Sequence, residues 1–273
     1  MALTWCAVRA DGLIDEGSGP PLVLIHGIPT WGYLWSTVIP PLAEDCRVLV
    51  PDLPGFGFSD KRDAFDRSIA RQAEYLDAWM RAIGVERATM IGHDIGGGVA
   101  LRLATATPER IDRLVLVNTV CYDSWPIELM LQFGHPAANR RLSSRMLATI
   151  LRQALKGGFQ SSPPAGLLDG LIAPYTTDVG KLSLIRNASA LNTNLTTEIV
   201  EQLPAIRIPT MILWGADDQF QPVDYGRRLA DDIPAAKFEP IPKAKHFVMI
   251  DRPRVVVGLL REFLSARSAR TAA

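Results

Sequence analysis

The feature that most constrains the fold is an alternation of short apolar runs with helical patterns. The runs are rich in Val, Ile and Leu, as is typical of strands that are buried on both faces. Six strands are predicted: Leu22 to Ile25, Val48 to Val50, Ala88 to Ile91, Leu114 to Val117, Met211 to Trp214 and, more weakly, Lys237 to Ile241. Because strands that alternate with helices pack as a parallel sheet covered on both faces, we predict an α/β protein. A hairpin around "RADG" is expected to add antiparallel edge strands.

The alternation stops between about Cys121 and Pro204. This stretch has helical patterns, such as Arg140 to Lys156, and a break at "GGFQSSPPAG", but no strand-like run. The sequence "AIRIPTMILWG" then restores the strand pattern. We therefore expect a helical cap, residues 121–204, inserted into an α/β core made of residues 1–120 and 205–273. Such a cap would cover the carboxyl ends of the strands, where open α/β sheets bind ligands.

Composition excludes several classes of function. Lys plus Arg and Asp plus Glu both number 29, so a nucleic-acid partner is not expected. The longest apolar stretches are about five residues, far below the roughly 20 that span a bilayer. Cys6, Cys46 and Cys121 are odd in number and far apart, which indicates neither a disulfide framework nor a metal centre. With no signal peptide apparent at the N-terminus, we expect a cytoplasmic protein without metal or cofactor.

A carboxylate occupies the most informative position in the chain. In "IGHDIGGGVALRLA", Asp94 follows a predicted strand and begins a predicted helix. This is the context of a nucleophile elbow, which usually carries Ser in the pattern G-x-S-x-G. The small residues Gly92, Gly96 and Gly97 allow the close packing that such a strained turn needs. A lone Asp between glycines is otherwise typical of a turn or a helix cap.

Two partners for Asp94 follow in the order nucleophile, acid, base that such hydrolases use. "LWGADDQF" places Asp217 and Asp218 just after a strand, and "KAKHFVMIDRP" places His246 before the last helix. Upstream, the backbone N–H of Ile28 follows His26-Gly27, and the N–H of Ile95 follows Asp94. These two N–H groups are the natural donors of an oxyanion hole.

The combination of motifs resembles the α/β-hydrolase fold superfamily along almost the whole chain. "HGIPTWGYLW", "PDLPGFGFSD" and "GHDIGG" are similar to the branch with an Asp nucleophile, which contains haloalkane dehalogenases and epoxide hydrolases. The pattern G-x-x-D after the strand, counted from Gly215, selects Asp218 over Asp217 as the acid. His26 and His93 are expected to be structural and to support the two loops by hydrogen bonds. From its position alone, Asp52 is expected to anchor a turn.

A carboxylate nucleophile suits displacement at saturated carbon. Attack on an ester carbonyl would give an anhydride, whereas displacement of a halide or opening of an epoxide leaves an ordinary ester on Asp94. His246, oriented by Asp218, would then activate a water that attacks the carbonyl carbon of this ester. The substrate is therefore expected to be a small, largely apolar organic molecule.

The leaving-group donor is less clear from the motifs. Dehalogenases of similar sequence carry side-chain donors at the positions of Ile28 and Ile95, and an apolar residue after His-Gly is more like the epoxide hydrolases. Epoxide hydrolases use cap tyrosines, for which Tyr175 and Tyr122 are the candidates here. Three tryptophans could also donate an N–H, namely Trp31, Trp35 and Trp125.

The sequence thus predicts an epoxide hydrolase first and a haloalkane dehalogenase second. A hydrolase-fold ligand receptor or a lyase is the alternative of another class, because one fold hosts many functions. Oligomeric state is not predicted.

Overall fold

A computed structural model describes residues 13–135, 137–234 and 236–266. Seven strands of these residues form one sheet in the order β1-β3-β2-β4-β5-β6-β7. The strands are β1 Leu13–Glu16, β2 Pro21–Ile25, β3 Arg47–Pro51, β4 Ala88–His93, β5 Ile111–Val117, β6 Thr210–Gly215 and β7 Ala236–Ile241. β1 pairs antiparallel with β3, and every other neighbouring pair is parallel. The predicted α/β fold and its six strands are confirmed, while the "RADG" hairpin lies outside the described residues.

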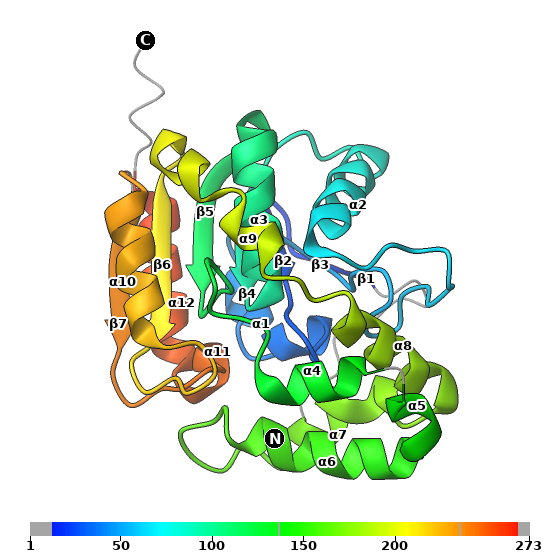
Figure 1. Cartoon of the computed structure of the whole chain (residues 1–273). Helices are drawn as coiled ribbons and strands as arrows, with labels where there is room; N and C mark the ends of the chain where they lie inside the picture. Colours follow the sequence, from blue (N-terminus) through cyan, green and yellow to red (C-terminus); the bar gives the residue numbers. More distant parts are fainter. Residues whose placement is uncertain (1–12, 136, 235, 267–273) are drawn as a thin grey trace.

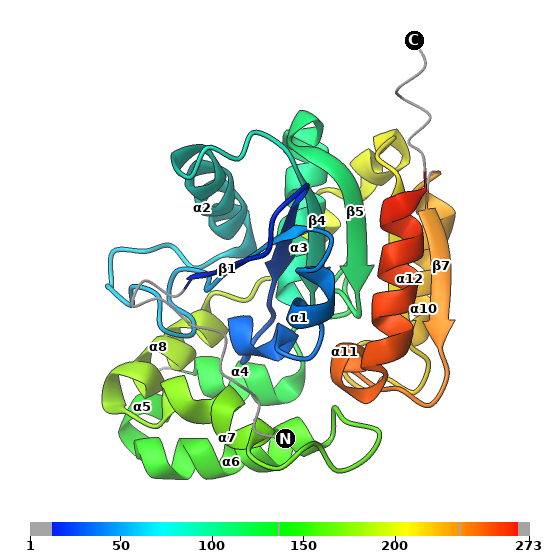
Figure 2. The same cartoon turned by 180° about the vertical axis from the view of Figure 1, so that it is seen from behind.

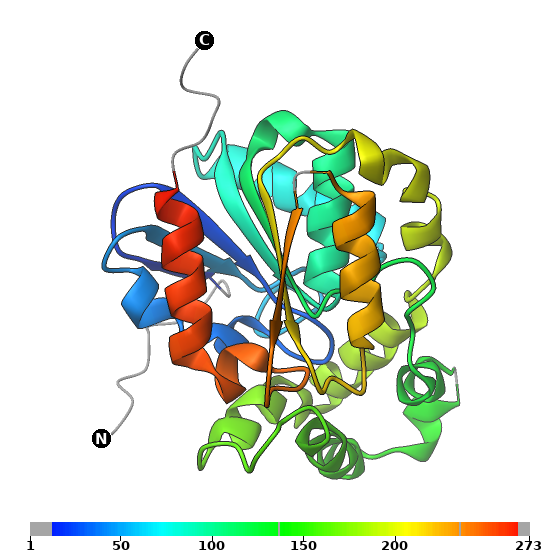
Figure 3. The same ribbon diagram turned by 90° about the vertical axis from the view of Figure 1, so that its left-hand side faces the viewer.

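Helices cover both faces of the sheet (Figures 2 and 3). One face carries α1 Ile39–Leu42, α11 Val248–Asp251 and α12 Pro253–Ser265, and the other carries α2 Ile69–Ala82, α3 Ile95–Ala106 and α10 Val223–Asp232. Because successive strand residues point to opposite faces, β4 sends Ile91 into the first apolar cluster and Met90 into the second. Three short 3₁₀ helices in the core, η1 Gly32–Trp35, η2 Pro108–Arg110 and η4 Val200–Ala205, complete the connections.

A helical segment, residues 118–209, joins β5 to β6; its residues 128–189 lie past the carboxyl ends of the strands, and the chain then returns beside α3 (Figure 1). Before η4 it contains α4 Glu128–Gly134, α5 Ala138–Arg141, α6 Ser144–Lys156, α7 Leu167–Ile172, η3 Ala173–Tyr175, α8 Asp178–Ser189 and α9 Asn194–Thr197. No described residue of this segment lies in a strand. The helical pattern from Arg140 to Lys156 is divided between α5 and α6, because Ser143 accepts a hydrogen bond from the Met146 N–H and so begins α6 anew.

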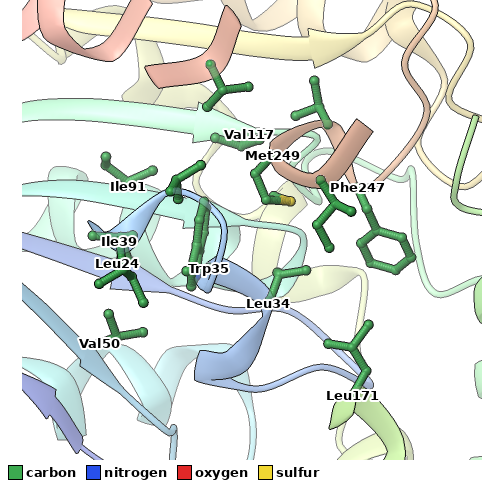
Figure 4. Close-up of a cluster of buried hydrophobic side chains, with 14 of the residues drawn as sticks. Leu24, Leu34, Trp35, Ile39, Val50, Ile91, Val117, Leu171, Phe247 and Met249 are labelled. Atoms are coloured by element: carbon green, nitrogen blue, oxygen red, sulfur yellow. The ribbon is translucent and has the colours of Figure 1, made fainter. Parts of the chain in front are cut away.

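The helical segment is fastened to the core at several points. The indole N–H of Trp31 donates to the Gly170 carbonyl at 3.0 Å. The buried guanidinium of Arg67 donates to the Ser183 carbonyl. Figure 4 shows Leu171 of α7 beyond Leu34 at the edge of the first apolar cluster. The segment is therefore held by both polar and apolar contacts. None of the described helices is long and apolar enough to cross a membrane.

Candidate active site

Asp94 occupies a sharp turn between β4 and α3. Its φ of 52° and ψ of −123° lie in a region that residues other than glycine rarely adopt, and this backbone conformation costs about 1–3 kcal/mol. The turn is held because the Asp94 carbonyl accepts hydrogen bonds from the N–H groups of Gly97 and Val120, at 3.0 and 3.1 Å. A Cβ at Gly96 would lie 2.4 Å from the Ile25 carbonyl oxygen, so α3 can start this close to β2 only with glycine there.

The Asp94 carboxylate is buried and faces two groups of donors. Its Oδ1 accepts the Ile28 N–H at 2.8 Å, and the Ile95 N–H also donates to this carboxylate. Its Oδ2 lies 3.9 Å from Nε2 of His246. The structure thus brings together the predicted nucleophile, both predicted backbone donors and the predicted base.

His246 is oriented by Asp218. Its Nδ1 lies 2.9 Å from Asp218 Oδ2, which assigns the ring proton to Nδ1 and leaves Nε2 as an acceptor directed at Asp94. Asp218 Oδ1 accepts the Phe220 N–H at 2.8 Å. Asp217, the other candidate acid, is exposed. The geometry therefore matches the choice of Asp218.

Asn118 completes the acid's surroundings and was not found from the sequence. It lies just past β5 with a positive φ of 42°. Its Nδ2 donates to Asp218 Oδ2 at 2.6 Å, and its Oδ1 accepts the Gly215 N–H at 3.2 Å. The only available signal was a polar residue at the carboxyl end of a buried strand. Asn118 ties the ends of β5 and β6 together and fixes the acid between them.

Burial and charge shift the pKa values of the central pair. Burial raises the pKa of Asp94, although His246 and the N–H groups of Ile28 and Ile95 act in the opposite direction. Burial alone would lower the pKa of His246, but the charge and hydrogen bond of Asp218, with the charge of Asp94, outweigh it. The net result is a His246 pKa above its usual value of 6.5.

A mostly apolar cavity opens in front of Asp94. It encloses about 570 Å³ of space between protein atoms, part of it continuous with solvent. The apolar lining comes from Ile28, Pro29, Ile95, Val120, Pro126, Ile127, Leu129, Met130, Leu151, Ala154, Leu155, Leu191, Phe220 and Phe247. The polar residues of the lining are Asp94, His246, Gln221 and Trp125. Such a cavity suits a small apolar ligand with few polar atoms.

The structure does not bring the two predicted tyrosine donors to this cavity. Tyr175 is completely buried, does not line the cavity, and has its hydroxyl without a hydrogen-bond partner in the part of the chain that the structure describes. The Tyr122 hydroxyl donates to Asp232 Oδ2 at 2.6 Å, also away from the lining. Both rings are buried in apolar clusters, that of Tyr175 in the first and that of Tyr122 in the second.

The three tryptophans are equally unavailable as donors. Trp125 lines the cavity, but its indole N–H donates to Thr196 Oγ1 at 2.7 Å. The Trp31 N–H is used by Gly170, and Trp35 is buried outside the lining. Gln221 is therefore the remaining polar side chain of the lining besides Asp94 and His246, and the sequence gave no reason to single it out.

Other polar residues support the loops around the site. His26 Nε2 accepts the Leu53 N–H at 3.0 Å, and His93 Nε2 lies 3.0 Å from the His246 carbonyl oxygen. Asp52 accepts N–H groups from Gly32 and Phe58, both at 2.8 Å. These contacts agree with the supporting roles predicted for His26, His93 and Asp52.

Comparison with known proteins gives one family and several relatives. The sequence matches the alpha/beta hydrolase fold family over residues 20–161 and 176–253. It is 27% identical to haloalkane dehalogenase 2 of Mycobacterium tuberculosis strain H37Rv, covering 92% of this chain and 90% of that protein. It is 26% identical to a cis-3-alkyl-4-alkyloxetan-2-one decarboxylase of Shewanella oneidensis, covering 92% and 84%. Among solved structures, an alpha/beta hydrolase fold protein from Burkholderia ambifaria superimposes with a TM-score of 0.86 at 28% identity, covering 92% and 93%.

Proposed function

Because this chain is a hydrolase that belongs to the alpha/beta hydrolase fold family, we propose that it acts through a covalent ester formed on Asp94. The observation that carries this proposal is the pairing of Asp94 with His246, 3.9 Å apart, at the end of an apolar cavity. A carboxylate in this place attacks saturated carbon and forms a stable ester. The helical segment acts as the cap of this site, as proposed for residues 121–204.

The first step breaks a carbon–leaving-group bond. Oδ2 of Asp94 attacks the substrate carbon, and the leaving group departs with the bonding electron pair. Oδ1 stays hydrogen-bonded to the Ile28 N–H at 2.8 Å, so the carboxylate approaches with one orientation. The product of this step is the Asp94 alkyl ester and the free leaving group.

The second step restores the enzyme. Nε2 of His246 takes a proton from a water, and the water oxygen attacks Cγ of the ester. The oxyanion that forms on Asp94 is stabilised by the N–H groups of Ile28 and Ile95. The bond from Cγ to the alkyl oxygen then breaks, and the imidazolium of His246 returns the proton to give an alcohol. The Asp94 carboxyl group releases the second proton of the water to solvent and becomes a carboxylate again. Asp218, 2.9 Å from Nδ1, stabilises this imidazolium.

The substrate class follows from the donors that the cavity offers. An epoxide leaves as an alkoxide and needs an acid, and neither Tyr175 nor Tyr122 lines the cavity. A bromide or iodide leaves as a stable anion and needs only a hydrogen bond. We therefore place hydrolysis of bromo- and iodoalkanes before epoxide hydrolysis, which reverses the order expected from the sequence. The naming of a full-length relative as a haloalkane dehalogenase supports this order.

Epoxide hydrolysis is retained as the second candidate because of Ile28. An apolar residue follows His26-Gly27, as in the epoxide hydrolases that the sequence resembles. In that reaction His246 would be the remaining side chain of the lining able to give a proton to the epoxide oxygen.

Mass measurement on a trapped variant tests the proposal. A His246→Gln variant should form the ester with 1-bromo- and 1-iodoalkanes but should not hydrolyse it, so its intact mass should rise by the alkyl group. The double variant that also carries Asp94→Ala is the matched control and should gain nothing. An adduct mapped to a Ser or Cys would contradict the mechanism. A panel of epoxides, haloalkanes and aryl esters separates the candidates, and absence of turnover throughout would favour the receptor or lyase alternative.

A further inference from the structure

Gln221 lies in the site without a role in the mechanism described so far. It belongs to the loop between β6 and α10, three residues after Asp218, and lines the same cavity as Asp94 and His246. The residue is 2% exposed. Its backbone carbonyl accepts the Trp214 indole N–H at 2.8 Å, which fixes the loop against β6. The main chain of Gln221 is therefore fixed relative to β6.

The carboxamide of Gln221, in contrast, has no hydrogen bond with any residue that the structure describes. A buried Oε1 without a partner occurs here and also at Gln72, outside the cavity lining, so this oxygen alone does not indicate a ligand. The Nε2 of Gln221 donates to no described residue, whereas the Nε2 of Gln72 donates to the Pro54 carbonyl. Because Gln221 also lines the cavity, its free N–H groups are available to an acceptor on a ligand.

We propose that an N–H of the Gln221 carboxamide donates to the leaving group of the substrate as the Asp94 ester forms. This inference rests on the proposed function, in which a halide departs from saturated carbon. As the carbon–halogen bond breaks, the electron pair leaves with the halogen, and the new anion accepts the hydrogen bond from Nε2. Trp125 cannot take this role while its N–H is held by Thr196. Rotation about the Cγ–Cδ bond of Gln221 can direct the amide nitrogen toward the cavity.

A leaving-group series gives this role a signature that a structural role lacks. Chloride concentrates its charge more than iodide and depends more on a donor. Loss of the Gln221 N–H should therefore slow chloroalkane and bromoalkane attack more than iodoalkane attack. A general disturbance of packing would slow all three halides to the same extent.

The experiment measures ester formation alone. Rates of Asp94 alkylation are followed by intact mass in the His246→Gln background, with 1-chloro-, 1-bromo- and 1-iodobutane. Adding Gln221→Met removes the N–H groups and keeps a side chain of similar length. Gln221→Glu replaces the amide with a carboxylate of the same shape, which has no N–H and repels the departing halide. Both should slow bromide displacement by about 10- to 100-fold, the effect of one hydrogen bond to an ion, and iodide displacement less.

Gln72→Met is the matched control, because Gln72 is also buried but its Nε2 donates to the Pro54 carbonyl at 2.9 Å, outside the cavity lining. It should leave the differences in alkylation rate between the halides unchanged.

Alkylation rates in the Gln221 variants equal to those of the parent, or a slowing identical for all halides, would overturn the inference while leaving Asp94 as the nucleophile. Unchanged alkylation with slower ester hydrolysis in the background with His246 intact would also overturn it, by assigning Gln221 to the water. Failure of every haloalkane to form an Asp94 ester would overturn the proposed function itself.

Discussion

The two sides of the cavity differ in chemistry and in how they are held. The floor consists of Asp94 and His246, 3.9 Å apart, supported by Asp218 and Asn118, and all four come from the carboxyl ends of the strands and the loops after them. Hydrogen bonds join His246 to Asp218 and Asp218 to Asn118. The roof consists of apolar residues from the helical segment. They are Ile127, Leu129, Met130, Leu151, Ala154 and Leu155, and their side chains make only apolar contacts, although hydrogen bonds such as that from Trp31 to Gly170 help to hold the segment. In the proposed mechanism, the floor makes and breaks the bonds, and the roof limits which molecules reach it.

The two sides meet at Gly158 and Phe247. Phe247 directly follows His246, packs in the first apolar cluster with Met249, and donates its N–H to the Gly158 carbonyl at 3.1 Å (Figure 4). A Cβ at Gly158 would lie 2.6 Å from Cε2 of Phe247. The break "GGFQSSPPAG" in the helical pattern is thus a contact between the helical segment and the base of the site.

The largest expected effect comes from the floor. Asp218→Asn should lower kcat about 10³- to 10⁴-fold, because the amide cannot stabilise the imidazolium of His246. Asp217→Asn, at the exposed neighbour, should change kcat less than about twofold. Steady-state kinetics on a bromoalkane measures both. Equal losses in the two variants would contradict the assignment of the acid.

The pH dependence of ester hydrolysis should report the same charge pair. His246 must be neutral to accept a proton from water. Its pKa is raised above 6.5 in the free protein, chiefly by Asp218, and Asp218 alone opposes the effect of burial in the ester, because the esterified Asp94 carries no charge. Hydrolysis should therefore be lost as the pH falls through the pKa of His246 in the ester, by about tenfold per pH unit below it. Pre-steady-state decay of the ester between pH 5 and 9 measures this fall in the hydrolysis rate and the pKa at its centre. An apparent pKa below 6.5 would show that burial outweighs the charge of Asp218 once Asp94 is esterified.

The unfolding free energy should change with pH in the opposite direction to ester hydrolysis: the contribution of His246 falls as the pH rises. Because its pKa is raised in the folded protein, protonation of His246 stabilises the fold below the unfolded pKa of about 6.5. This contribution is lost as the pH rises through the folded pKa. His246→Gln should therefore flatten the pH dependence of the unfolding free energy just above pH 6.5, as denaturant titrations would detect.

A change at the junction of floor and roof should have an intermediate effect. Gly158→Ala places a methyl group against Phe247 and Phe220 and should lower the unfolding free energy by about 1–3 kcal/mol, with a lower kcat. Gly258→Ala is the matched control, since a Cβ there meets no atom within 4 Å and α12 gains about 0.5–1 kcal/mol in helix propensity. Thermal unfolding and kcat of both variants test whether the roof contact positions His246. Equal behaviour would show that it does not.

The smallest expected effect concerns a residue outside both sides. Tyr175→Phe removes a buried hydroxyl that has no partner in the described residues and does not line the cavity. Haloalkane and epoxide turnover should change less than about twofold. The unfolding free energy should stay within about 1 kcal/mol, because no hydrogen bond is lost. A strong loss of epoxide turnover alone would show that Tyr175 is the donor and would make epoxide hydrolysis the first candidate function again.

Most of the floor could be predicted because its parts are local. A buried strand ends with its side chains at the carboxyl edge of the sheet, so a motif at each strand end predicts what gathers there. Asp94, His246, Asp218 and the N–H donors of Ile28 and Ile95 all follow this rule. The contact of Asn118 with Asp218 was not predicted, because a single Asn after a strand forms no recognisable motif. The division of Arg140 to Lys156 at Ser143 escaped because helical periodicity continues through a cap.

The sequence by itself determined the sheet, the order of its strands along the chain and the place of a carboxylate at the turn after β4, because these depend on local periodicity and on short motifs. Only the tertiary structure decided which side chains face the cavity. Whether Tyr175, Tyr122, Trp125 or Gln221 can reach a ligand depends on how the helices of the segment rotate and on which N–H groups find partners within the protein. That choice is made by packing between residues far apart in the chain, such as Trp125 and Thr196, and no local pattern encodes it.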